Sequence, residues 1–128
     1  SDMERTGDQA ADIAEITRHI GGSHLPASSH IGEMARAAVK MVTDSVDSVV
    51  KRDLKMARGV IQYDDVVDRL FNEVKGELTA LIRADSASAE LALDLLMVVK
   101  YLERIGDHAV NVAEWVAYSI TGVHESGK

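Results

Sequence analysis

Residues 101–114 read YLERIGDHAVNVAE, a stretch in which apolar residues return at steps of three and four. This is the spacing of an α-helix that buries one face and exposes the other. The spacing continues outward from about residue 86 to residue 121, where Gly122 is placed to end the helix. The predicted buried stripe consists of Leu91, Leu95, Val98, Leu102, Ile105, Ala109, Val112, Val116 and Ile120.

Two further long helices are predicted upstream, over residues 29–52 and 54–84, and Asp53 offers an N-cap between them. No stretch alternates with the period of two that a strand would show. Helices of this length joined by short turns predict an all-α fold, an antiparallel three-helix bundle. Phe71 and Trp115 are expected to be anchors of its core.

An extra helix is predicted before the bundle, over residues 2–20. Residues 21–29 contain two adjacent glycines and the single proline of the chain, which are typical of a break between helices. The expected organisation is therefore an N-terminal helix within residues 1–21, a linker at 22–28, the bundle at 29–122 and a short tail at 123–128.

The composition excludes several classes of function. The formal net charge of the 128 residues is −7, which disfavours nucleic acid or an anionic membrane as a partner and favours cations. Cysteine is absent, so the chain offers neither disulfides nor thiolate metal ligands. The apolar runs are far shorter than a membrane span, and we expect a cytoplasmic protein with no membrane insertion.

Two pairs of acidic residues have the spacing of one helical turn. Glu103 and Asp107 lie in the opening stretch, on the flank of its apolar stripe, and Asp64 and Asp68 lie in the preceding predicted helix. A helical wheel puts Asp68 within about 20° of Ile61, so at least one carboxylate of that pair should point into the apolar arc. A buried carboxylate requires a compensating cation or a basic partner.

If the two helices pack side by side, Asp64, Asp68, Glu103 and Asp107 could converge. Such an oxygen-rich set suits iron, magnesium, manganese or calcium, and zinc less specifically. The alternative is an ordinary solvated face, neutralised by neighbouring arginines. Histidines add little to the site: His108 is turned away from the acidic pair, and His30 is expected in the linker, exposed to solvent.

A sequence similar to residues 101–114 occurs at residues 2–15. The two segments share Glu, Arg, Gly, Asp, Ala, Ala and Glu at a constant offset, so Glu4 and Asp8 repeat the spacing of Glu103 and Asp107. Bundle folding alone does not require a repeated Glu-Arg-x-Gly-Asp. Gly106, inside the predicted helix, is interpreted as a point of close approach to a neighbouring element.

These motifs resemble those of the PhoU family of phosphate-uptake regulators. The resemblance rests on residues 102–114 and on the acidic run at 64–68, followed by Arg69 and Leu70. The family resemblance implies tandem three-helix bundles whose acidic motifs bind metal clusters. It implies metal-ligand roles for Asp64, Asp68, Glu103 and Asp107. Residues 2–20 would then be the end of a first repeat, whose Glu4 and Asp8 lack a partner motif in this chain.

The resemblance also implies a function. Members are cytoplasmic negative regulators that link the phosphate ABC transporter to its sensor histidine kinase, and they are not enzymes. A homodimer is one way to cover the apolar face of the first helix. Two other interpretations stay open on the residues alone: a carboxylate-bridged di-metal enzyme, and a structural helical module whose acids are simply solvated.

Overall fold

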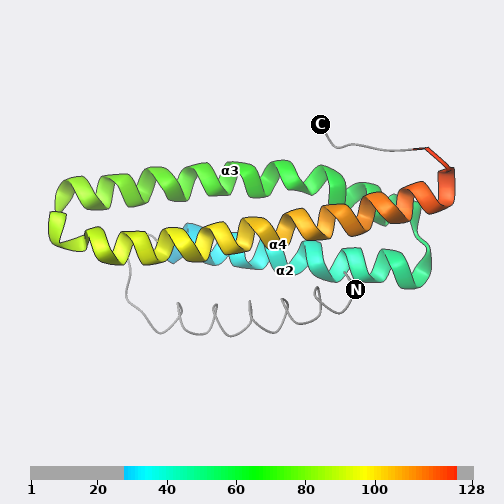
Figure 1. The fold of residues 1–128 in the computed structure, drawn as a ribbon, viewed down its shortest axis with the longest axis horizontal. Helices are drawn as coiled ribbons and strands as arrows, with labels where there is room; N and C mark the ends of the chain where they lie inside the picture. The colour runs from blue at the N-terminus through cyan, green and yellow to red at the C-terminus, as the bar shows by residue number, and fades with distance from the viewer. Residues whose placement is uncertain (1–27, 124–128) are drawn as a thin grey trace.

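A computed structural model of the chain describes residues 28–123, which form three long helices running side by side (Figure 1). These are α2 (Ser28–Lys51), α3 (Leu54–Ala84) and α4 (Ala89–Thr121), with a short 3₁₀ helix, η1 (Ser86–Ser88), before α4. Consecutive long helices run in opposite directions, so the prediction of an all-α antiparallel bundle is confirmed. The predicted helix at residues 2–20 lies outside the described part.

The turn from α2 to α3 takes only two residues. Arg52 has a φ of 49°, in the left-handed region, and the Asp53 amide then donates to the Ser48 carbonyl at 3.1 Å. Asp53 caps α3 as predicted, because its Oδ1 accepts from the Met56 amide at 3.0 Å. The chain therefore reverses without a loop, which keeps α2 and α3 in contact along their length.

The turn from α3 to α4 is organised by Asp85. Its carboxylate accepts from the Ala87 amide at 3.0 Å, and its carbonyl accepts from the Ser88 amide at 2.9 Å. Contacts two and three residues apart favour a tight 3₁₀ turn. The α-helix consequently begins at Ala89 and not near residue 86 as the apolar spacing suggested. At its other end, Gly122 closes α4 with a φ of 73°, as predicted.

The core lies between the three helices, and every helix contributes fully buried side chains. The largest of these are Ile31, Met34, Met41, Leu102, Ile105, Val67, Val74, Val99 and Val116. Leu91 was expected in the buried stripe, but it is 40% exposed, and Ile82 near the end of α3 is 36% exposed. The reason is their position: α3 and α4 extend past the start of α2, so within residues 28–123 no third helix covers that end of the bundle (Figure 1).

The expectation that Trp115 is a core anchor is wrong, because its side chain is 61% exposed. Helical register places it beside the stripe and not within it, one position before buried Val116. Phe71 is partly buried against the core, with the Lys100 ammonium 5.2 Å from its ring centroid. The position of each of these two aromatic residues around its helix therefore determines how buried it is more than its hydrophobicity does.

Candidate functional site

Gly106 marks the place where the three helices meet. A Cβ at this position would lie 3.5 Å from Met41 Sδ on α2 and 3.8 Å from Val67 Cγ1 on α3. This supports the interpretation of Gly106 as a point of close approach. Asp107 directly follows Gly106, and Asp68 directly follows Val67, so the acidic pairs of α3 and α4 stand at the same level of the bundle.

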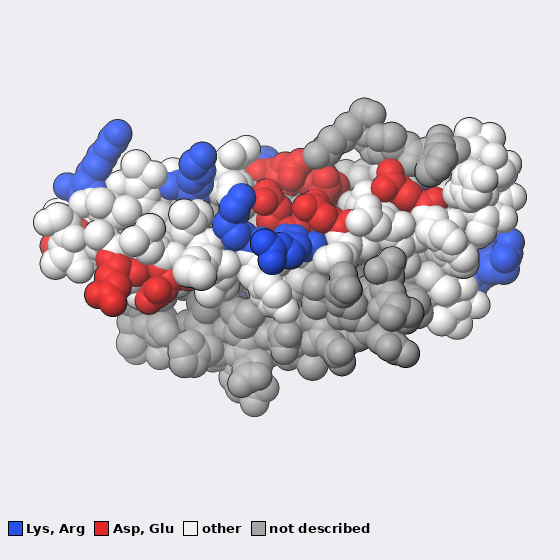
Figure 2. All heavy atoms as spheres, viewed as in Figure 1, with Lys and Arg blue, Asp and Glu red and all other residues white. Residues whose placement is uncertain are grey.

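Acidic side chains gather at this level on the molecular surface. Figure 2 shows them as a patch over the middle of α3 and the adjoining part of α4, with basic side chains at its edge. The patch concentrates negative charge on one face of a chain that already carries an excess of seven negative charges. A local field of this sign raises the concentration of cations near the surface.

Asp64 is the buried member of the α3 pair, with only 7% of the residue exposed. It lies three positions after Ile61 and three before Val67, both buried, so the helical register carries it into the apolar stripe. Asp68 is partly exposed. The prediction that at least one carboxylate of the pair points into the apolar arc is confirmed, although the wheel indicated Asp68 instead. Both residues interact with other groups of the protein.

Glu103 and Asp107 flank the core on α4, as the helical wheel predicted. The Glu103 side chain is 27% exposed and lies 3.6 Å from the Lys100 ammonium, while Asp107 is exposed. Lys100 in turn lies over Phe71 of α3. An ion pair this open to solvent contributes little to stability. Its effect is to place one cation next to Glu103, at the edge of the acidic patch.

The donor chemistry of the four carboxylates suits a hard metal ion, but their arrangement is not that of a formed site. Within residues 28–123, no three Asp, Glu, His or Cys side chains are grouped as a metal ion would require. The metal roles of Asp64, Asp68, Glu103 and Asp107 therefore stay a prediction. Glu4 and Asp8 lie outside the described residues.

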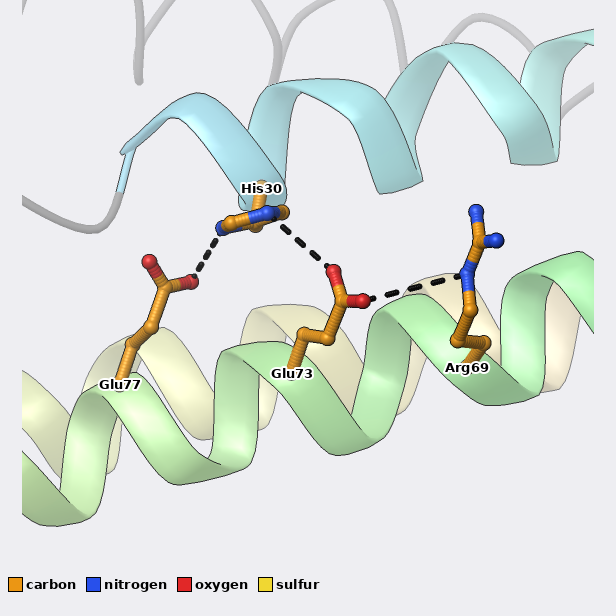
Figure 3. A network of polar contacts seen from close by, with 4 residues as sticks. All are labelled: His30, Arg69, Glu73 and Glu77. Carbon is orange, nitrogen blue, oxygen red and sulfur yellow. Dashed lines mark hydrogen bonds and ion pairs between the residues drawn. The ribbon is translucent and has the colours of Figure 1, made fainter.

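Sequence reasoning missed the role of His30. It was expected in an exposed linker, but it lies in the first turn of α2, where its ring faces Glu73 and Glu77 of α3 (Figure 3). The distances are 2.8 Å from Nδ1 to Glu77 Oε1 and 3.2 Å from Nε2 to Glu73 Oε2. The sequence does show Glu73 and Glu77 one helical turn apart. It does not show that His30 is their partner, because this depends on how α2 and α3 align.

Residues 31–116 match the family model described as the PhoU domain. The chain belongs to the PhoU domain family. This match covers most of the described bundle, from the first turn of α2 to the last turns of α4, and it confirms the resemblance carried by the acidic motifs. Within residues 28–123, no helix has the length and apolar character needed to cross a membrane.

The relatives are named for phosphate transport. The chain is 38% identical over 123 residues to the phosphate-specific transport system accessory protein PhoU homolog of Clostridium acetobutylicum, covering 95% of this chain and 56% of that protein. It is 32% identical over 124 residues to PhoU homolog 1 of Thermotoga maritima, covering 95% of this chain and 53% of the relative. The chain thus spans about half the length of these relatives.

A solved structure has the same fold. The crystal structure of PhoU from Pseudomonas aeruginosa aligns with a TM-score of 0.75 and 31% sequence identity, covering 80% of this chain and 49% of the other. The all-α bundle of α2, α3 and α4 is therefore a PhoU-type arrangement, in agreement with the family match.

Proposed function

We propose that this chain forms part of an accessory protein of a phosphate-specific transport system and acts by protein contact, not by catalysis. The match of residues 31–116 to the PhoU domain carries the proposal. The relatives from Clostridium acetobutylicum and Thermotoga maritima, 38% and 32% identical, are named as phosphate-specific transport system accessory proteins. In this proposal the protein works in the cytoplasm as a negative regulator, and its partners are the phosphate ABC transporter and its sensor histidine kinase.

The exposed surface of α4 supports a role in protein contact. Leu93, Met97, Trp115 and Tyr118 are exposed by 58%, 72%, 61% and 46%. Along a helix these positions fall within one narrow arc, since they are separated by steps close to whole turns. Large apolar side chains on a surface, tryptophan and tyrosine above all, are enriched where proteins bind one another.

Replacing Trp115 by serine is expected to weaken binding to the purified transporter or kinase by about tenfold or more, because central tryptophans often dominate an interface. The measurement is the dissociation constant of the 128-residue chain with each partner. Val50→Ser is the matched control, since Val50 is 73% exposed but lies on α2. No binding to either partner by the unaltered chain would contradict the proposal, as would equal losses in both variants.

We further propose that Asp64, Asp68, Glu103 and Asp107 bind a divalent or trivalent cation, with iron, zinc, magnesium and manganese as candidates. The support is the buried carboxylate of Asp64, the shared level of the two pairs and the acidic patch of Figure 2. Binding would require these side chains to come closer together than they are in the described structure. Lys100 would have to give up its pairing with Glu103.

Titrating Mn²⁺, Mg²⁺, Zn²⁺ or Fe²⁺ into metal-free protein is expected to raise its melting temperature, because a ligand that binds only the folded state stabilises it. Each variant is compared with its own metal-free melting temperature. The rise should be lost in Glu103→Gln and Asp64→Asn but kept in Asp94→Asn, an exposed acid of the same helix as Glu103. An equal rise in all three variants would contradict this site. Metal-dependent turnover of a phosphoester would instead favour a di-metal enzyme.

A further inference from the structure

The start of α2 is attached to α3 by one histidine and two glutamates. His30 stands in the first turn of α2, and Glu73 and Glu77 stand one helical turn apart on α3, so the imidazole ring bridges between them (Figure 3). Arg69, one turn earlier on α3, places its Nε 3.9 Å from Glu73 Oε1. The carboxylate of Glu73 therefore lies between two basic groups, while Glu77 has His30 as its ion-pair partner.

Both ring nitrogens of His30 face a carboxylate oxygen, at 2.8 Å for Nδ1 and 3.2 Å for Nε2. A neutral imidazole carries one N–H and can donate to only one of them. The other nitrogen would then direct its lone pair at a carboxylate, and the two would repel. The imidazolium, with an N–H on each nitrogen, can hydrogen-bond to Glu77 and form an ion pair with Glu73 at the same time. This arrangement favours the protonated ring.

We propose that His30, Glu73 and Glu77 form a proton-dependent clip that fixes the first turn of α2 to α3. The clip includes the third residue of α2, near the beginning of the described bundle. Protonation of His30 holds this first turn in place, and loss of the proton releases the side-chain bridge. Proton concentration thereby controls how firmly the first turn of α2 is held against α3.

The charges around the ring set the direction of the pH dependence. The hydrogen bond to Glu77 raises the pKa of His30 above its ordinary value of 6.5, partial loss of solvent opposes this, and the charges of Glu77, Glu73 and Glu33 add to the rise. Among the described residues, the charged groups that act on the ring come from α2 and α3 and none from α4. The stabilisation from the clip is complete below pH 6.5 and is lost as the pH rises through the raised pKa.

The test follows His30 in the 128-residue chain by NMR. The ring nitrogens should both be protonated at about pH 6, and the pKa should lie above that of an unperturbed histidine. Hydrogen-exchange protection of amides 32–36, corrected for the intrinsic pH dependence of exchange, should fall several-fold between about pH 6 and pH 8 relative to amides in the middle of α2. In His30→Gln the protection should no longer change with pH, and Glu77→Gln should lower the pKa of His30.

One control separates the clip from general effects of charge. Asp44→Asn removes the ion pair of Lys40, 2.8 Å long and on the same helix, and should leave the titration of His30 unchanged. A pKa of His30 at or below 6.5 would overturn the proposal. So would an equal fall in protection with pH in the unaltered chain and in His30→Gln.

Discussion

Replacing Leu102 by alanine is expected to lower the free energy of unfolding by about 2–5 kcal/mol. Leu102 is fully buried in the middle of α4 and belongs to the single core cluster that all three helices share. Removing three of its carbons gives up their burial and leaves a cavity that neighbouring helices fill only in part. Urea unfolding followed by circular dichroism measures the change, since a bundle of this size is expected to unfold in one step.

Leu93→Ala is the matched control for Leu102→Ala. It makes the same chemical change in the same helix, but Leu93 is 58% exposed. The expected change is within about 0.5 kcal/mol, because an exposed leucine gives up little buried area. A loss at Leu93 as large as that at Leu102 would show that its face of α4 is covered, contrary to the exposure described above.

Replacing Gly106 by leucine is expected to destabilise the bundle by about 1–3 kcal/mol, through overpacking. The first added carbon alone would come within 3.5 Å of Met41 Sδ and 3.8 Å of Val67 Cγ1. The remaining carbons of leucine would have to displace side chains of α2 and α3. The free energy of unfolding from urea denaturation measures the loss.

Alanine at position 106 should behave differently from leucine. Its single methyl group fits at ordinary van der Waals distance, and alanine favours a helix over glycine by about 1 kcal/mol, so Gly106→Ala should leave stability equal or raise it. Gly76→Leu is the matched control for the larger side chain, because nothing lies within 4 Å of a Cβ at Gly76. It should stabilise α3. Destabilisation by Gly76→Leu equal to that by Gly106→Leu would contradict the packing argument.

Local sequence signals were sufficient for the helices and their ends. Asp53 and Gly122 were predicted as caps, and both have those roles, because capping depends only on backbone groups a few residues away. The boundary at Asp85 was also predicted, but the 3₁₀ turn after it was not. That turn depends on the hydrogen bond from the Ala87 amide to the Asp85 carboxylate, and the spacing of apolar residues gives no information about it.

The candidate site was predictable in part. Spacing on single helices identified the two acidic pairs, and the bundle places both pairs at the level of Gly106. Which carboxylate of the α3 pair is buried depended on the small rotation of α3 about its own axis, and this rotation buries Asp64. A helical wheel assumes an ideal value of about 100° per residue, and small deviations from this angle add up over several turns. The wheel therefore could not decide whether Asp64 or Asp68 is the buried residue.

By itself, the sequence determined the all-α class, the approximate extent of the three helices and the family. Periodicity, caps and motifs are all properties of contiguous stretches of sequence. Tertiary structure alone decided what stands across from each side chain. It set Trp115 on the surface, joined His30 to Glu73 and Glu77, and brought Gly106 against Met41 and Val67. These outcomes depend on the axial alignment and rotation of packed helices, which the combined fit of many side chains determines and no single stretch encodes.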